Sequence, residues 1–222
     1  MTNLQGAVVL VVGATGGLGS RIADQLESNG AIVARSSKSA GHDLRAPSVI
    51  QQVLDDTNAQ YGRLDGLVVA SGVVAFGAAS DLEPATVDEL FAVNTTCPIQ
   101  LITRSQPYLA ASAREGREPF VVTLSGVVAE TPVAGLAAYS ASKAGLAAFV
   151  VAAAREYRRA GIRLLDARPG HTGTALSEHP IAGSAPRFGA PLDPGLVAAR
   201  IITAIVDGEK DLPSTAFQNR PR

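Results

Sequence analysis

The stretch VVLVVGATGGLG, from Val8 to Gly19, decides the fold class of this chain. Five consecutive apolar residues are typical of a strand buried on both faces, and four glycines follow them within seven positions. From Gly17 to Asn29 the residue pattern predicts a helix. Glycine permits a tight turn and a close approach of the backbone to a ligand, and the start of a helix offers unpaired N–H groups to a phosphate. This order predicts a dinucleotide-binding site, with a glycine turn needed only for packing as the alternative.

Apolar β-rich runs and helical patterns alternate along the rest of the 222 residues. The predicted strands are Ala7–Val12, Ala31–Arg35, Gly66–Ala70, Phe120–Leu124, Ile162–Ala167 and Leu212–Thr215. The predicted helices are Gly17–Asn29, Ala46–Tyr61, Thr86–Ala111, Ala137–Ala160 and Asp193–Gly208. This alternation predicts an α/β, three-layer, doubly wound Rossmann fold with a mainly parallel sheet. We expect residues 1–217 to form a single dinucleotide-binding and catalytic domain and residues 218–222 to form a flexible tail.

One connection is unusually short. Only about ten residues separate the strand that ends near Arg35 from the helix that begins near Ala46. Two neighbouring parallel strands need a crossover of about a dozen residues or more, so a further strand and helix cannot fit there. The sequence therefore predicts that one edge strand and its helix are missing after the second strand, with residues 36–45 as a loop.

Composition and charge exclude several classes of protein. Nineteen basic residues face twenty acidic ones, so there is no electrostatic case for a nucleic-acid or membrane partner. The single cysteine, Cys97, excludes an internal disulfide framework and fits a reducing compartment. The longest apolar run, Ala144–Ala154, is about half the roughly 20 residues of a membrane helix, and no basic residue precedes Arg21 as a signal peptide requires. We expect a soluble, cytoplasmic protein.

The end of the second predicted strand bears on the choice of dinucleotide. An acid at this place favours NAD, whereas a basic residue accommodates the 2′-phosphate of NADP. The chain has Arg35-Ser36-Ser37-Lys38 here and no acid before Asp43. Two cations and two hydroxyls favour NADP(H), with NAD(H) as the alternative. The other interpretation is an exposed loop that carries these residues for solubility.

The glycine turn together with Tyr139-x-x-x-Lys143 resembles the short-chain dehydrogenase/reductase family of the single-domain, Rossmann-fold type. The resemblance covers nearly the whole chain. Supporting matches are Gly13-x-x-x-Gly17-x-Gly19, Asp43-Leu44, Gly62-Arg63-Leu64-Asp65, Asn94 and Pro169-Gly170-His171-Thr172-Gly173-Thr174. The chain departs from the family where Val69-Ala70-Ser71-Gly72 replaces Asn-Asn-Ala-Gly, which keeps the glycine and loses two side-chain amides.

The glycine turn, the end of the second predicted strand and the resemblance together predict a set of dinucleotide-binding residues at the ends of the strands. These are Gly13, Thr15, Gly16, Gly17, Leu18, Gly19, Arg35, Ser36, Ser37, Asp43, Leu44, Ser71, Gly72, Tyr139, Lys143, Pro169, Gly170, Thr172 and Thr174. For Thr172 and Thr174 the alternative is a surface turn that binds nothing. No spacing of histidines or cysteines predicts a metal site.

Tyr139 and Lys143 are four residues apart on a predicted helix and so lie on one face, within reach of each other. A tyrosine hydroxyl has a pKa of about 10, and a nearby ammonium lowers that pKa by favouring the phenolate. The resemblance implies that Tyr139 is the general acid/base, that Lys143 lowers its pKa and holds the nicotinamide ribose, and that Asn94 helps to position a water. This chemistry transfers a hydride between NADP(H), or NAD(H), and a carbonyl or alcohol substrate.

The family's substrate-binding serine stands thirteen residues before the tyrosine, where this chain has Gly126. Ser125 is one residue earlier. If the following loop contains one extra residue, Ser125 supplies the hydroxyl; if not, Ser125 faces elsewhere, because adjacent strand residues point to opposite sides. We favour Ser125 as catalytic, together with Tyr139, Lys143 and Asn94. The offset also sustains an alternative function: a catalytically weak or inactive dinucleotide-binding sensor.

The residues 137–160 are apolar almost all round, and a helix of this kind needs cover on two sides. One side can be the sheet, and the other suggests a subunit interface, with residues 86–111 as a second candidate. The sequence therefore predicts a homodimer or homotetramer. The segment between Thr174 and Asp193, about twenty residues rich in small side chains and proline, is expected to cover the substrate.

Overall fold

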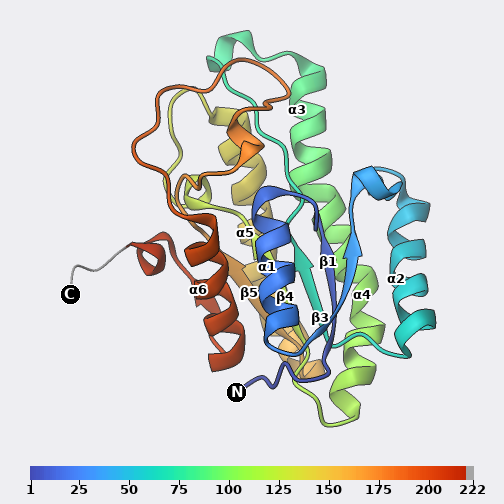
Figure 1. The fold of residues 1–222 in the computed structure, drawn as a ribbon. Helices are drawn as coiled ribbons and strands as arrows, with labels where there is room; N and C mark the ends of the chain where they lie inside the picture. Colours follow the sequence, from blue (N-terminus) through green and yellow to red (C-terminus); the bar gives the residue numbers. More distant parts are fainter. Residues whose placement is uncertain (219–222) are drawn as a thin grey trace.

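In the computed structural model, which describes residues 1–218, six parallel strands form one sheet in the order β2-β1-β3-β4-β5-β6 (Figure 1). The strands are β1 Val8–Val12, β2 Ile32–Ser36, β3 Gly66–Val69, β4 Phe120–Leu124, β5 Arg163–Ala167 and β6 Asp211–Leu212. The helices are α1 Gly17–Ser28, α2 Pro47–Tyr61, α3 Pro84–Phe91, α4 Cys97–Arg114, α5 Ala137–Tyr157 and α6 Pro194–Asp207. The predicted tail, 218–222, lies outside the described residues except for Gln218.

The predicted loss of an edge strand is confirmed. β2 pairs only with β1 in the described sheet, and Ile32 at its start is 43% exposed. Between β2 and α2 the chain forms one short 3-10 turn, Lys38–Ala40, in place of a strand and helix. β2 lies on one side of β1 and β3 on the other. The direction in which successive strands are added to the parallel sheet therefore reverses at β1. The crevice at such a reversal, at the carboxyl ends of the strands, is where doubly wound folds bind ligands.

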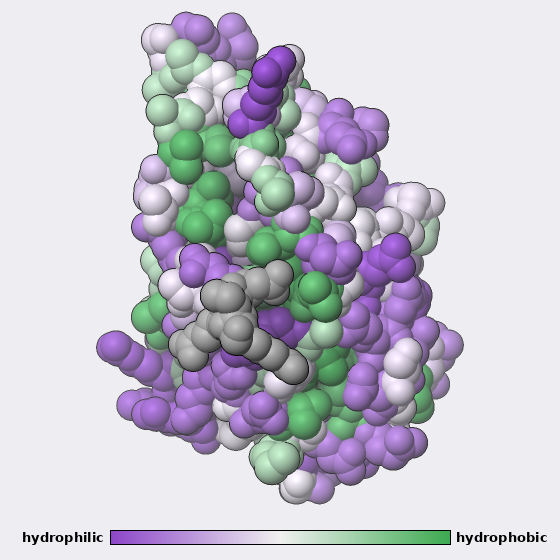
Figure 2. All heavy atoms as spheres, turned by 60° about the vertical axis from the view of Figure 1, so that its left-hand side comes forward, coloured by the Kyte–Doolittle hydropathy of each residue, from purple (hydrophilic) through white to green (hydrophobic). Residues whose placement is uncertain are grey.

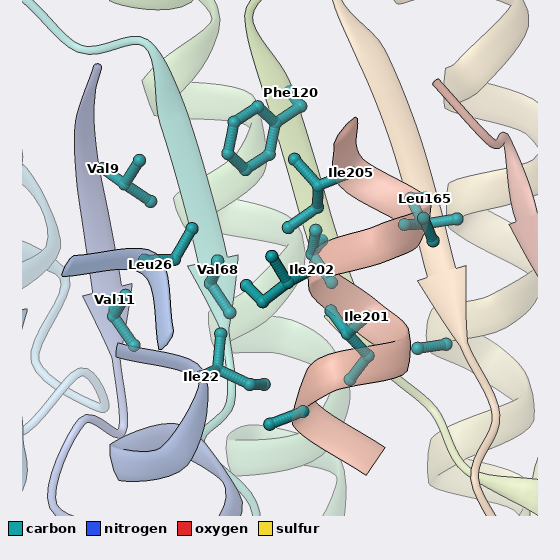
Figure 3. Packing of buried hydrophobic residues seen from close by; sticks show 14 of the residues in the cluster. Val9, Val11, Ile22, Leu26, Val68, Phe120, Leu165, Ile201, Ile202 and Ile205 are labelled. Atoms are coloured by element: carbon teal, nitrogen blue, oxygen red, sulfur yellow. The ribbon is translucent and has the colours of Figure 1, made fainter. Parts of the chain in front are cut away.

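Two layers of helices cover the sheet (Figure 1). Along β1, Val9 and Val11 face α1 and α6, whereas Leu10 and Val12 face α2 and α4. Both faces are thus buried, which explains why β1 is continuously apolar in sequence. Figure 3 shows the first of these cores, in which side chains of α1 and α6 meet over the strands; its labelled residues are Val9, Val11, Ile22, Leu26, Val68, Phe120, Leu165, Ile201, Ile202 and Ile205.

The predicted single helix over 86–111 is instead three elements. α3 ends at Phe91, one wide turn of π-helix spans Ala92–Thr96, and α4 begins at Cys97. Pro98 has no N–H to donate to the carbonyl of Asn94, four residues earlier, so regular α-helical bonding fails at this point. A π-helical turn inside a helix often marks a functional site.

The helix α5 continues through a 3-10 turn, and Ala137–Ala160 is long and apolar enough to cross a membrane by length and composition alone. In this structure Leu146, Val150 and Ala153 of α5 are buried against the sheet as part of its second core. On the face shown in Figure 2, hydrophobic residues form small patches among hydrophilic ones.

The segment after β5 returns over the carboxyl end of the sheet before α6 begins. Its ends are held together by a bridge between Thr172 and Leu192. Its middle is tied to the residues that follow β3: the N–H of Phe76 donates to Ala182 O (2.9 Å), and the N–H of Ile181 donates to Val74 O (2.8 Å). The expected cover is therefore anchored directly beside the strand ends.

Candidate functional site

The glycine turn lies between β1 and α1 and touches the end of β3. Gly13 has a φ of +81°, and a Cβ on it would lie 2.6 Å from the Ser71 nitrogen. A Cβ on Gly19 would lie 2.2 Å from the carbonyl oxygen of Gly13. Only glycine fits at these two positions, while Thr15 and Gly16 remain exposed in front of the helix N-terminus. The turn is therefore open to a ligand on one side and tightly packed on the other.

At the end of β3, three of the predicted residues meet. A Cβ on Gly72 would lie 3.3 Å from Asn94 Oδ1 and 3.3 Å from Lys143 Nζ. The Asn94 side chain is fully buried and holds both backbone groups of Val73: Oδ1 accepts from its N–H (3.0 Å), and Nδ2 donates to its carbonyl (2.9 Å). Asn94 thus braces the segment whose family amides are absent here. Its own carbonyl, which receives no N–H from Pro98, remains free of an α-helical bond.

Tyr139 and Lys143 project from the same face of α5, with Lys143 Nζ 6.0 Å from the centre of the tyrosine ring. Lys143 is 5% exposed, and its ammonium donates to the carbonyl of Leu124 (2.9 Å). Burial raises the pKa of Tyr139 to about 12. Burial lowers the pKa of Lys143 to about 8, while the negative charge of Asp166 opposes that fall. Near neutral pH the phenol therefore keeps its proton and most of the lysine keeps its charge.

The hydroxyl of Ser125 is engaged by another residue of the chain. Ser125 is fully buried, and its Oγ donates to Asp166 Oδ2 at 2.5 Å. Gly126, which occupies the family's serine position, has φ +76° and ψ 166°. Residues other than glycine rarely adopt this backbone conformation. The hydrogen bond to Asp166 uses the proton of the Ser125 hydroxyl, and this supports the alternative in which Ser125 has a structural role.

Sequence reasoning missed the acid that binds Ser125. Asp166 on β5 also accepts from Thr123 Oγ1 (2.7 Å) and from Arg168 Nη1 (3.0 Å). Arg168 in turn binds Glu130 in the loop before α5 (2.5 Å) and Asp211 on β6 (2.6 Å). The signal was present, because an acid and an arginine interrupt the otherwise apolar run that leads to Pro169-Gly170.

The Pro169–Thr174 turn closes the other side of the site. Thr172 Oγ1 donates to the carbonyl of Gly170 (3.0 Å) within the turn. Thr174 packs on the start of α1, because a Cβ on Gly17 would lie 2.7 Å from the Thr174 Cβ. The structure therefore brings the glycine turn and the Pro–Gly turn into contact, as a shared dinucleotide site requires.

The predicted NADP-determining residues at the end of β2 do not act together. Arg35 Nη2 is bound to Asp24 (2.7 Å) and Glu27 (3.0 Å) in the second and third turns of α1, away from the helix N-terminus. This pairing argues against Arg35 as a phosphate ligand. The hydroxyl of Ser36 bonds His42 Nδ1 (3.1 Å), and that of Ser37 caps the 3-10 turn by accepting from the N–H of Ala40 (3.3 Å).

The other two residues predicted in this region face α4 and α3. Leu44 is buried in the core, and its carbonyl accepts from the thiol of Cys97 (3.2 Å). Asp43 binds Arg45, and hydrogen bonds from Arg45 hold the pKa of Asp43 at about 2. Arg45 also binds Glu89 (3.0 Å), so Asp43, Arg45 and Glu89 form one ion cluster on the surface.

Comparison with known proteins agrees with this arrangement. The family model for short chain dehydrogenase matches residues 7–182. The chain belongs to this family. Its membership supports an oxidoreductase activity that uses a nicotinamide dinucleotide.

Among curated relatives, the ipsdienol dehydrogenase of Ips pini is 27% identical over 201 residues, which cover 76% of each chain. The 3-oxoacyl-acyl-carrier-protein reductase of Escherichia coli is 27% identical over 202 residues, which cover 82% of this chain and 81% of the relative. A cyclic-di-GMP-binding biofilm dispersal mediator protein of E. coli is 29% identical over 177 residues, which cover 74% of this chain and 73% of the relative.

Solved structures share the fold over almost the whole chain. A 3-ketoacyl-(acyl-carrier-protein) reductase of Brucella melitensis complexed with NADH has a TM-score of 0.86 at 21% identity, over 95% of this chain and 97% of the other. A dehydrogenase/reductase of Sinorhizobium meliloti has a TM-score of 0.81 at 25% identity, over 97% and 98%. The predicted fold class and family are thereby confirmed.

Proposed function

We propose that this protein transfers a hydride reversibly between a nicotinamide dinucleotide and a carbonyl or alcohol substrate, with Tyr139 as general acid/base. The observation that carries the proposal is the meeting of Lys143, Asn94 and Gly72 at the end of β3, one helical turn from Tyr139. The proposal assigns catalysis to this place because it lies at the chain reversal of a doubly wound sheet.

Two features of the strand ends fit a dinucleotide. The turn at Gly13 and Gly19 leaves no room for side chains and presents the N-terminus of α1, where a pyrophosphate is stabilised. The backbone of Ser71 packs on that turn, and its hydroxyl is buried and has no hydrogen-bond partner among residues 1–218. An unpaired buried hydroxyl costs free energy, and a ribose or phosphate oxygen would satisfy it. We propose Ser71, Gly72, Thr172, Thr174 and Lys143 as further dinucleotide contacts.

The nicotinamide supplies or accepts the hydride when it is bound. Tyr139 carries its proton near neutral pH, because burial raises its pKa to about 12, and so it is set to donate that proton to a carbonyl oxygen. The phenolate that remains is stabilised by the ammonium of Lys143. Positioned proton transfer of this kind contributes roughly 10²- to 10⁴-fold in rate. The ring of Tyr139 packs against Val74, Phe76 and Leu136, so we propose a substrate that is apolar beside its carbonyl.

The direct test combines nucleotide binding with turnover. We expect NADPH or NADH to raise the melting temperature, and a panel of apolar ketones and aldehydes to reveal nucleotide oxidation by the wild type. Tyr139→Phe should retain the nucleotide-induced stabilisation and lose about 10²- to 10⁴-fold in turnover. No stabilisation by either nucleotide would contradict the proposal at its first step.

We propose Lys38, rather than Arg35, as the cation that favours NADP(H). Arg35 is bound to two acids of α1, whereas Lys38 is exposed at the end of β2 and forms no ion pair among residues 1–218. A charge-assisted hydrogen bond contributes about 1.5–3 kcal/mol, or roughly 10- to 150-fold in affinity. Lys38→Ala should weaken NADPH binding by such a factor and leave NADH binding unchanged, with Arg35→Ala as the matched control that changes neither. Equal losses in both variants would refute this assignment.

A second candidate function is a dinucleotide-binding sensor with little or no turnover. The observation that favours it is the engagement of Ser125 with Asp166, which removes the hydroxyl expected at the substrate. One relative is also described as a cyclic-di-GMP-binding protein. Melting curves with cyclic-di-GMP beside NADPH and NADH distinguish the two functions. Stabilisation by a dinucleotide without any Tyr139-dependent turnover would favour the sensor.

We further propose a homodimer or homotetramer that associates through residues 86–111 and 137–160. Val151 on α5 is 56% exposed and Phe91 at the end of α3 is 37% exposed, although both are apolar. Light scattering should give a multiple of 22.7 kDa for the wild type. Val151→Asp should shift the mass toward the monomer, whereas Leu196→Asp, at a similarly exposed apolar site on α6 (64%), should not. A monomeric wild type at micromolar concentration would refute the proposal.

A further inference from the structure

Asp166 is a buried carboxylate on β5, the strand beside the one whose end Lys143 binds. Asp166 is 2% exposed and receives three hydrogen bonds, from Thr123 (2.7 Å), Ser125 (2.5 Å) and Arg168 (3.0 Å). Thr123 pairs directly with Asp166 across β4 and β5, and both side chains lie on the face of the sheet that α5 covers. The carboxylate is therefore fixed in the layer between the sheet and the helix that carries Lys143.

The same contacts fix the atom that Lys143 binds. The ammonium of Lys143 donates to the carbonyl of Leu124, and Leu124 stands between the two residues whose hydroxyls bind Asp166. Ser125 is also tied to β5 through its N–H, which donates to Ala167 O (3.2 Å). The end of β4 is thus held on both sides of the carbonyl that receives the ammonium.

The charges around Lys143 are few. On its own helix the titratable neighbour is Tyr139, and on β5 it is Asp166; the nearby parts of β3, β4 and the π-helical turn contribute Gly72, Leu124 and Asn94, which carry no charge. Arg168, which binds Asp166, also binds Glu130 and Asp211, so one guanidinium is shared by three carboxylates.

The three carboxylates differ in their contact with water. The side chains of Asp211 and Glu130 are 59% and 27% exposed, so water screens their charges. The side chain of Asp166 is only 3% exposed. Its charge acts on Lys143 through a poorly screened interior.

We propose that Asp166 is a positioning residue that acts through Lys143: its buried carboxylate keeps the ammonium charged and anchors the β4 end to which the ammonium binds. The inference rests on the proposed role of Lys143 in the reaction. It explains why an acid is placed inside an apolar strand of this chain. It also explains the hydrogen bond of Ser125, which connects the Asp166 carboxylate with the end of β4.

The chain allows a direct test without any substrate, because it contains only three lysines, Lys38, Lys143 and Lys210. In protein labelled with ¹³C at the lysine ε-carbon, Lys143→Arg assigns the Lys143 resonance. We expect this resonance to titrate near pH 8 in the wild type. In Asp166→Asn the midpoint should fall by roughly 0.5 to 1 unit, less than the 1 to 3 units of a direct ion contact, because the charge that favours the ammonium is gone. Asp211→Asn also removes an Arg168 partner, but from an exposed place, and should leave the midpoint unchanged.

A midpoint in folded Asp166→Asn that stays within 0.2 unit of the wild type, or that shifts equally in Asp211→Asn, overturns the proposal. If Asp166→Asn does not fold, the reciprocal titration carries the test in wild-type protein. The chemical shift of the Asp166 carboxyl carbon should then change as Lys143 loses its proton, and Lys143→Met should abolish this change, since it reports the loss of a nearby positive charge. The absence of this change refutes the proposal. These readouts are independent of turnover, so failure of the proposed enzyme activity is seen separately.

Discussion

Replacing Ser125 with alanine separates a structural serine from a catalytic one. The hydroxyl is fully buried and donates at 2.5 Å to the carboxylate of Asp166, which keeps two of its three donors in the variant. Loss of a buried hydrogen bond to a charged group costs about 1–3 kcal/mol. In a domain of this size each kcal/mol lowers the melting temperature by about 2–4 °C, so the expected decrease is about 2–12 °C.

The matched control is Thr123→Val. Thr123 is equally buried and donates to the same carboxylate at 2.7 Å, but it lies two residues earlier in the chain, inside β4, whereas Ser125 follows the strand. We expect similar decreases in melting temperature for both variants, measured by scanning calorimetry. Turnover at saturating nucleotide should fall less than tenfold in either, against the roughly 10²- to 10⁴-fold loss expected for Tyr139→Phe. An unchanged melting temperature in Ser125→Ala, with a turnover loss as large as that of Tyr139→Phe, would show that Ser125 acts on the substrate.

Three further predictions follow from close contacts and charge. Gly19→Ala places a Cβ 2.2 Å from the Gly13 carbonyl oxygen, so the turn must shift and nucleotide-induced stabilisation in melting curves should disappear. Gly183→Ala, at φ +71°, places a Cβ 1.8 Å from the carbonyl oxygen of Phe76; kcat/KM should fall while nucleotide stabilisation remains, because only the substrate cover is displaced. Burial alone would raise the pKa of Asp65, but hydrogen bonds from Ser112, the Val8 N–H and Arg63 outweigh it and lower that pKa. Its contribution to stability is therefore present above the unfolded pKa of about 3.9 and lost as pH falls through the folded value, so Asp65→Asn should flatten the acid limb of the unfolding free energy against pH.

The sequence was sufficient for features that depend on neighbours in the chain. The apolar run before Gly13, the glycine spacing and the short connection after Arg35 predicted the first strand, the open turn and the missing edge strand. The break at the π-helical turn was missed, although Pro98 announces it, because the apolar pattern on either side is continuous. Helix propensity and apolar periodicity are averaged over many residues, whereas the missing N–H of Pro98 removes one hydrogen bond, to the carbonyl of Asn94.

Side-chain roles that depend on distant partners could not be predicted. Ser125 is held by an acid 41 positions later, and Arg35 by two acids that precede it on α1. In both cases the residue type suited the expected role, but a partner that the local sequence does not reveal determines where the side chain points. The Tyr139–Lys143 pair was less exposed to this error, because one helix fixes both side chains and the spacing alone places them on one face.

The residues at positions 125, 126 and 166 form one structural unit, because Ser125 is bound to Asp166 and Gly126 follows Ser125 in the loop. A serine at 126 would need the left-handed backbone that Gly126 adopts at φ +76°, at a cost of about 1–3 kcal/mol, so the loop as built does not favour a side chain there. Gly126→Ser alone should therefore lower stability without raising turnover. In the triple variant Ser125→Gly/Gly126→Ser/Asp166→Ala, the glycine precedes the serine and the carboxylate no longer holds the strand end. If the loop then relaxes, turnover should exceed that of Gly126→Ser at equal nucleotide occupancy. If the triple variant has no higher turnover than Gly126→Ser, the lack of a serine hydroxyl at the substrate is not what limits turnover.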